Sequence, residues 1–209
     1  MCIDLLLHGC LPSNDTLIEV NFTALKEQCG IRAIVFDKDN TLTAPYDLSI
    51  HPNATAGFES AMHTFGRDNV AILSNSAGTG DDHNYEDAKK IELNIDIPVI
   101  RHLEKKPGGL SEVMNHFGTE TVSDPSQICI IGDRLLTDIV FGNLYGMLTI
   151  HCDPLCSGAE KARDNFIASV IHSMENKVMY GNWFGSRMLR EQRLKHSLWN
   201  EELPIKLSS

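Results

Sequence analysis

Short, continuous apolar runs are the feature of this sequence that most limits its fold. Such runs are typical of strands covered on both faces, as in a parallel sheet between two layers of helices. Segments with helical character separate them, and this alternation favours right-handed crossovers within one sheet. The sequence therefore predicts an α/β fold, with a Rossmann-like parallel sheet flanked by helices. The expected strands are 31–36, 70–73, 98–100, 128–131 and 147–150, and the expected helices are 54–65, 85–93, 109–117 and 136–145.

The length and charge of the chain limit its organisation and its partners. The 209 residues suit a single domain, because folding units commonly contain roughly 100–200 residues. The formal net charge of −10 at pH 7 argues against a nucleic-acid partner, since phosphate backbones attract a basic face. The sequence contains no apolar run of about 18 residues, so we expect no membrane-spanning helix. An anionic substrate would need a metal ion or a local cationic pocket.

Polar side chains follow the expected strands at the point where each strand ends. Asp37 and Ser74 follow the first two runs, Lys105 and Lys106 come shortly after the third, and Asp133 follows the fourth. In parallel α/β sheets, ligands bind at the carboxyl ends of the strands. We therefore expect carboxylate, hydroxyl and ammonium groups to meet at one edge of the sheet.

Two pairs of acids indicate a magnesium site. Asp37 and Asp39 lie two residues apart beyond a strand end, and Mg2+ prefers oxygen ligands. The alternative for this pair is an acidic turn, since Asp, Asn and Thr all favour turns. Asp133 and Asp138 form the second pair, and a helix N-cap is the alternative for Asp138. Because both pairs follow strand ends, the sequence favours metal ligands.

The hydroxyl and lysine segments are weaker signals on their own. A hydroxyl at Ser74 could bind a phosphoryl oxygen, although loop composition explains an isolated Ser-Asn-Ser more often than chemistry does. Pro107 restrains the backbone of Lys106, so that this ammonium could neutralise phosphoryl charge. The alternative is a solvated basic loop. We expect Ser74, Asn75 and Lys105 to bind substrate and Lys106 to act in catalysis.

Together the four segments resemble the haloacid dehalogenase (HAD) superfamily of phosphatases. The resemblance covers roughly residues 31–152, and its motifs appear in the family's order. The DxDx[TV] motif corresponds to residues 37–41, the hydroxyl motif to Ser74, the lysine motif to Lys106, and the acidic motif to Asp133 and Asp138.

The resemblance implies a chemical role for each matched residue. Asp37 would attack phosphorus and form a phosphoaspartate, while Asp39 would act as general acid and then as general base. Mg2+ would be held by the Asp37 carboxylate, the Asp39 main-chain carbonyl and Asp133, with Asp138 supporting these ligands. The hydroxyl and lysine motifs would hold the transferring phosphoryl group. Asp39 favours ester hydrolysis over dehalogenation, because only an ester leaving group needs a proton.

A finer resemblance is to the mitochondrial phosphatidylglycerophosphate phosphatases. It is carried by residues 36–42, 73–78, 97–102, 105–108 and 132–138. It implies a phospholipid substrate, phosphatidylglycerol as product during cardiolipin synthesis, and peripheral attachment to the matrix side of the inner mitochondrial membrane. The first 30 residues do not resemble an Arg-rich transit peptide.

The motif spacing leaves no room for a cap domain. Thr41 and Ser74 are about 32 residues apart, as are Ser74 and Lys106, and a βαβ unit already takes roughly 30 residues. The substrate must then help to exclude water, as a membrane lipid, a phosphoprotein or a nucleic-acid end would. The alternative function is therefore an uncapped HAD phosphatase for a phosphoprotein or a soluble ester. An inert scaffold would be favoured by a missing acid, but every expected acid is present.

Residues 157–209 are expected to form a helical extension of the single domain. Within it, residues 183–199 contain Trp183, Trp199 and a cluster of basic side chains. This composition favours contact with an anionic membrane surface. Because the helical arrangement is imperfect, packing against the domain or against another subunit of a homo-oligomer is an alternative of at least equal weight.

Overall fold

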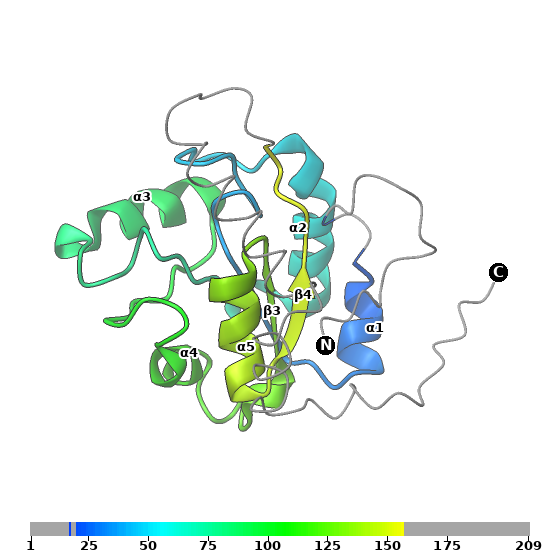
Figure 1. Ribbon diagram of the computed structural model, residues 1–209. Helices are drawn as coiled ribbons and strands as arrows, with labels where there is room; N and C mark the ends of the chain where they lie inside the picture. The colour runs from blue at the N-terminus through cyan, green and yellow to red at the C-terminus, as the bar shows by residue number, and fades with distance from the viewer. Residues whose placement is uncertain (1–16, 18–19, 157–209) are drawn as a thin grey trace, which may run out of the picture.

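The computed structural model describes residue 17 and residues 20–156 (Figure 1). The predicted extension at 157–209, including 183–199, lies outside the described residues. The regular elements are α1 (Phe22–Glu27), β1 (Ala33–Phe36), α2 (Pro52–Phe65), η2 (Arg67–Asn69), β2 (Val70–Ile72), η3 (His83–Tyr85), α3 (Glu86–Ile95), α4 (Leu110–Phe117), η4 (Pro125–Gln127), β3 (Ile128–Gly132), η5 (Leu135–Ile139), α5 (Val140–Tyr145) and β4 (Leu148–His151).

Four parallel strands form the sheet, in the order β2-β1-β3-β4. The first strand is therefore central: Ile34 pairs with Val70 of β2 on one side and with Cys129 of β3 on the other. Strands β1, β2 and β3 are apolar and buried along their whole length. The edge strand β4 ends in the half-buried residues Ile150 and His151. The predicted α/β fold with a parallel sheet is confirmed.

The prediction of a strand at residues 98–100 is wrong. Val99 makes only an isolated parallel bridge to Ile72. Ile72 N–H donates to the Pro98 carbonyl at 2.9 Å, and Ile100 N–H donates to Ile72 at 2.8 Å. Pro98 has no N–H to offer, and proline confines a segment to the edge of a sheet. The run therefore borders β2 without extending into a ladder.

Helices cover both faces of the sheet, as the continuous apolar runs predict. Alternate residues of β1 point to opposite sides: Ile34 and Phe36 pack with α1, α2 and α3, whereas Ala33 and Val35 pack with α4 and α5. Figure 1 shows α1 and α2 on one side of β3 and β4, with α4 and α5 on the other. The two layers bury the sheet and leave its strand ends as the place for polar side chains.

The predicted helices are confirmed with shifts at their ends, except for the last. Residues 136–145 are a single helix in the prediction, but the structure has the π-helical turn η5 followed by α5. The helix α1 was not predicted, because six residues are too few for a periodic pattern; the Asn21 side chain caps it by accepting from Ala24 N–H at 2.9 Å. Among the described residues, no helix has the length and apolar character needed to cross a membrane.

The two stretches where a cap domain could be inserted are described in full. Between β1 and β2 lie a loop, α2 and η2, and between β2 and Lys106 lie η3, α3 and connecting loops. Neither stretch contains a separate folded unit. Within residues 20–156, this agrees with the predicted absence of a cap.

Candidate active site

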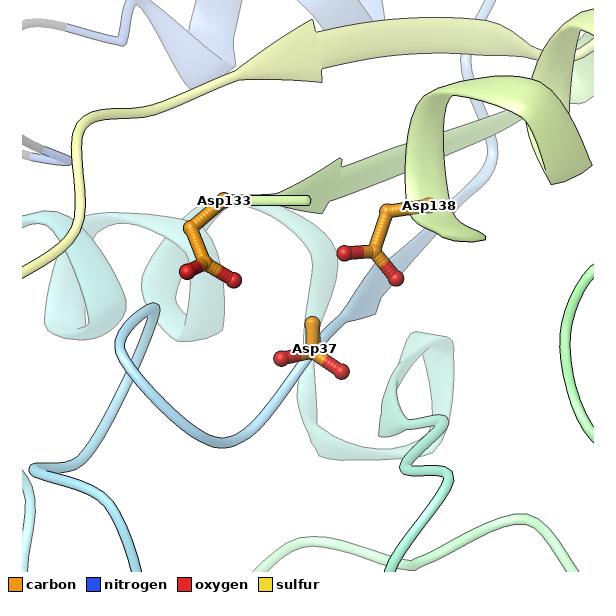
Figure 2. A group of neighbouring side chains, drawn as sticks. All are labelled: Asp37, Asp133 and Asp138. Atoms are coloured by element: carbon orange, nitrogen blue, oxygen red, sulfur yellow. The ribbon is translucent and has the colours of Figure 1, made fainter. Parts of the chain in front are cut away.

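Three buried carboxylates meet at the carboxyl ends of β1 and β3. Asp37 follows β1, Asp133 follows β3, and Asp138 lies on η5. Each offers an oxygen atom, and these atoms all lie within 4.8 Å of one another. Figure 2 shows the three side chains as neighbours beyond the ends of the strands. The structure thus brings together three of the four predicted metal ligands through their side chains.

A buried lysine completes this cluster. Lys106 Nζ lies 2.6 Å from Asp37 Oδ1 and also donates to Asp138 Oδ1. Burial raises the pKa of Asp37 to about 6, against the opposing effect of Lys106, and burial likewise raises the pKa of Asp138. Desolvation lowers the pKa of Lys106, but the neighbouring Asp138 and Asp37 outweigh it, so that its pKa is raised. The ammonium group therefore remains charged at neutral pH.

Gly132 and the π-helical turn explain how Asp138 reaches the cluster. A Cβ atom built on Gly132 would lie 2.5 Å from Asp138 Cγ, so only glycine leaves space for this carboxylate. Arg134 N–H donates to Asp138 Oδ2 at 3.2 Å and holds the carboxylate against the start of the turn. Single π-helical turns are often found at functional sites. The interpretation of Asp138 as a helix cap is thus replaced by one in which it joins the acid cluster.

The acid cluster fits a hard divalent cation. With all three carboxylates ionised, the cluster and its ammonium group would carry a net charge of −2 in a buried space. Burying such charge is costly unless it is neutralised. An all-oxygen set of carboxylates suits Mg2+ better than softer metals. The donor set therefore agrees with the magnesium prediction, which stays a prediction.

The fourth predicted ligand, Asp39, directs its side chain to other partners. Its Oδ1 accepts from Lys38 Nζ at 2.5 Å and from Tyr46 N–H at 3.0 Å. Its Oδ2 accepts from the Ser76 hydroxyl at 3.1 Å. The Asp39 carboxylate is therefore held by its own donors, apart from the buried acid cluster. Its predicted metal contact through the main-chain carbonyl stays a prediction.

A chain of hydroxyl groups links the Ser74 segment to Asp39. Ser74 is buried, and its Oγ lies 2.9 Å from Ser76 Oγ. The sequence analysis missed Ser76 and Lys38 as site residues. One signal could have identified Ser76: it comes two residues after Ser74, a spacing that can place two side chains on the same side of an extended segment. Nothing local marked Lys38.

Asn75 contacts the backbone of Lys106 at both ends of its amide. Its Oδ1 accepts from Lys106 N–H at 2.7 Å, and its Nδ2 donates to the Lys106 carbonyl at 3.4 Å. Asn75 therefore positions the lysine loop, and its predicted contact with substrate stays a prediction. Lys105 lies at the surface, where its Nζ is 2.7 Å from Asp81 Oδ2. Its ammonium is paired outside the acid cluster, unlike that of Lys106.

The arrangement separates two acids that could do different work. Asp37 lies beside an ammonium group that can offset the charge of an approaching anion. Asp39 lies two residues on and in contact with donors that keep it apart from the buried cluster. The predicted roles, nucleophilic attack by Asp37 and proton transfer by Asp39, stay predictions.

Known proteins are similar in sequence to most of this chain. Residues 9–156 match a family model described as mitochondrial PGP phosphatase. Phosphatidylglycerophosphate phosphatase 1 (chloroplastic/mitochondrial) of Arabidopsis thaliana is 42% identical over 158 residues, which are 75% of this chain and 42% of that protein. Its chloroplastic counterpart in Chlamydomonas reinhardtii is 41% identical over 143 residues, 68% of this chain and 51% of that protein.

A fungal protein with the corresponding enzyme name is also similar to this chain. A mitochondrial phosphatidylglycerophosphatase of Saccharomyces cerevisiae is 38% identical over 118 residues, 56% of this chain and 64% of that protein. The chain spans about half the length of the curated relatives it matches. The family model covers most of the chain, including all four motifs of the site. The chain belongs to the mitochondrial PGP phosphatase family.

Proposed function

We propose that this protein is a Mg2+-dependent phosphatase that hydrolyses phosphatidylglycerophosphate to phosphatidylglycerol and phosphate through a phosphoaspartate intermediate. The observation that carries the chemistry is the contact between Lys106 and Asp37 inside a cluster of three buried carboxylates. The family and its relatives, which are named for this lipid, support the choice of substrate. Production of phosphatidylglycerol would place the enzyme in cardiolipin synthesis.

In the first half-reaction, Asp37 attacks the phosphorus atom of the terminal phosphate. A bond forms between the carboxylate oxygen and phosphorus, and the ester bond to the glycerol oxygen breaks. Asp39 donates a proton to that oxygen, so that it leaves as an alcohol. Splitting the displacement in this way replaces one difficult step by two easier ones.

In the second half-reaction, water releases the phosphoryl group from Asp37. Asp39, now ionised, accepts a proton from the attacking water, and the bond between phosphorus and the Asp37 oxygen breaks. Inorganic phosphate leaves, and both acids return to their starting protonation states. Asp39 thus serves as acid and base in turn.

Cationic and polar groups reduce the repulsion between an anionic nucleophile and an anionic ester. Lys106 lies against Asp37 and can also meet a phosphoryl oxygen, while the Ser74 hydroxyl offers a hydrogen bond. Mg2+ held by Asp37 and Asp133, with Asp138 in support, would supply further stabilisation of negative charge. Asn75 would act on this step by fixing the backbone of Lys106.

Peripheral contact with a membrane is part of the proposal. Six large apolar side chains are exposed among the described residues, and four lie in segments that follow strand ends or the bridged 98–100 segment: Tyr46, Leu48, Leu103 and Leu136. Apolar side chains around the site could enter the headgroup region while a lipid phosphate reaches Asp37. The mitochondrial names of the fungal relatives support a mitochondrial location. Attachment to the matrix side of the inner membrane is the finer part of the proposal.

A phosphate-release panel tests the proposal. Purified protein is given phosphatidylglycerophosphate in mixed micelles, a soluble alkyl phosphate and a phosphopeptide, each with Mg2+ or with EDTA. We expect release from the lipid to be fastest and to depend on Mg2+. Faster turnover of the phosphopeptide or the soluble ester would favour the alternative, an uncapped phosphatase with another substrate. Release from none of the three would refute the phosphatase assignment.

A further inference from the structure

Lys38 is a buried lysine inside the motif that holds both catalytic acids. Only 4% of its surface is exposed, although the DxDx[TV] pattern leaves its position open to any residue. Its Nζ donates to Asp39 Oδ1 at 2.5 Å, to the Asp47 carbonyl at 3.0 Å and to Thr43 Oγ1 at 3.2 Å. An ammonium group has three donors, so all three are used.

Within the described residues, Lys38 and Lys106 are the buried lysines. Each contacts one of the two catalytic acids: Lys106 contacts Asp37, and Lys38 contacts Asp39. A buried ammonium group is costly unless it is paired. Here each pairing also determines where a reacting carboxylate lies.

Lys38 restrains Asp39 in two ways. The direct contact is charge-assisted, and such hydrogen bonds are roughly twice as strong as neutral ones. The indirect contact runs through the loop that follows, because Lys38 also holds the Asp47 carbonyl and Thr43. That loop delivers Tyr46 N–H to the same Asp39 oxygen at 3.0 Å.

The remaining contact of Asp39 does not replace these two. Ser76 donates a single neutral hydrogen bond, at 3.1 Å, to the other carboxylate oxygen. Without the ammonium group, Asp39 would keep neutral donors only. The loop carrying Tyr46 would keep the hydrogen bond from Thr43 N–H to the Lys38 carbonyl at 3.0 Å, but it would lose the contacts of the Lys38 side chain with Thr43 Oγ1 and the Asp47 carbonyl. The carboxylate could then rotate about its side-chain torsions.

We propose that Lys38 is a positioning residue for Asp39, and that it holds this carboxylate in the orientation from which it exchanges a proton with the leaving oxygen. This inference rests on the proposed function. It deepens that function, because efficient cleavage of alkyl esters would then depend on Lys38. An alkyl oxygen needs the proton of Asp39 when its bond to phosphorus breaks, whereas p-nitrophenolate leaves without one.

Leaving-group dependence therefore separates positioning from simple structural damage. The quantity to measure is kcat/KM, because it covers the steps up to departure of the leaving group. For Lys38→Met, we expect kcat/KM to fall about 100-fold on phosphatidylglycerophosphate and only about threefold on p-nitrophenyl phosphate, since general acid catalysis is commonly worth 10²–10⁴-fold. Asp39→Asn should show the same selectivity.

Matched variants complete the test. Lys90→Met removes an exposed lysine, paired with Asp87 on α3, and should leave both substrates unaffected. If Lys38→Met does not fold, Lys38→Gln provides the same comparison with a neutral donor at the same position. Thermal melting curves confirm which variants are folded.

The possible outcomes distinguish this inference from the proposed function. A folded Lys38 variant that loses activity equally on both esters, or on neither, overturns the positioning role. A wild-type protein that hydrolyses neither ester overturns the proposed function, and the inference with it. Selective loss on the alkyl ester supports both.

Discussion

Replacing Gly132 by alanine should displace Asp138 and impair the acid cluster. The added Cβ would lie 2.5 Å from Asp138 Cγ and from its Oδ2. Ordinary van der Waals contact begins near 3.4 Å, so one group must move by close to an ångström. Asp138 is fully buried and is held by Lys106 and by Arg134 N–H, so it cannot turn toward solvent. The backbone of Gly132 is not in the left-handed region, which leaves the Cβ contact as the cause.

The size of the effect follows from this contact. Overpacking a buried site costs about 1–3 kcal/mol, and each kcal/mol lowers Tm by about 2–4 °C in a protein of this size. The loss of activity should be larger in proportion, because a misplacement of about 1 Å near the chemistry can cost 10²-fold. We therefore expect kcat to fall about 100-fold, with a fall in Tm of several degrees.

Two measurements test this prediction, with Gly80→Ala as the matched control. A Cβ on Gly80 would meet its nearest atoms, on Leu103, at 4.0 Å, and its backbone is also outside the left-handed region. Phosphate release gives the activity, and thermal melting with and without Mg2+ gives the stability and the effect of the metal. Gly132→Ala protein with normal turnover and the usual Mg2+-dependent rise in Tm would refute the reasoning.

Three further predictions concern the charged residues of the site. Asp37→Asn should abolish turnover, because an amide cannot form the acyl phosphate; turnover at the wild-type rate by purified variant would contradict its role as nucleophile. Lys106→Ala should lose far more activity than Lys105→Ala, because Lys106 contacts Asp37 whereas Lys105 pairs with Asp81 at the surface. Equal losses in folded proteins would contradict the catalytic role of Lys106. Asp133→Asn should raise the Tm of the metal-free protein, since it removes one of three clustered carboxylates. It should also abolish the rise in Tm that we expect Mg2+ to cause by binding to the folded state. An unchanged response of this variant to Mg2+ in thermal melting would exclude Asp133 as a ligand.

The sequence was sufficient for the fold class and for the place of the two acids that follow strands. Continuous apolar runs require cover on both faces, and parallel strands bring their carboxyl ends to one edge. Because Asp37 and Asp133 each come at the end of such a run, the sequence predicts both at that edge. That they lie next to each other follows from the pairing of β1 with β3, which only the structure shows.

Two elements were misjudged because their hydrogen bonds depend on neighbours. The run 98–100 looks like a strand, but Pro98 cannot donate, and the segment makes only a bridge with β2. The sequence 136–145 reads as one helix, yet its first turn is π-helical, and Asp138 packs against Gly132 of the adjoining strand. Apolar patterning reports which residues are buried and does not distinguish a strand from a bridge or an α-turn from a π-turn.

By itself, then, the sequence determined the sheet, its buried faces and the acids at its edge. Only the tertiary structure decided which partner each polar side chain takes: Lys106 reaches Asp37 across 69 positions of the chain, and Asn75 holds the Lys106 backbone across 31. It also assigned Lys38 to Asp39 and to the loop at Thr43, and left Lys105 at the surface with Asp81. The physical reason is that backbone patterning follows from local periodicity, whereas a side-chain contact depends on the rotamers and loops that packing selects.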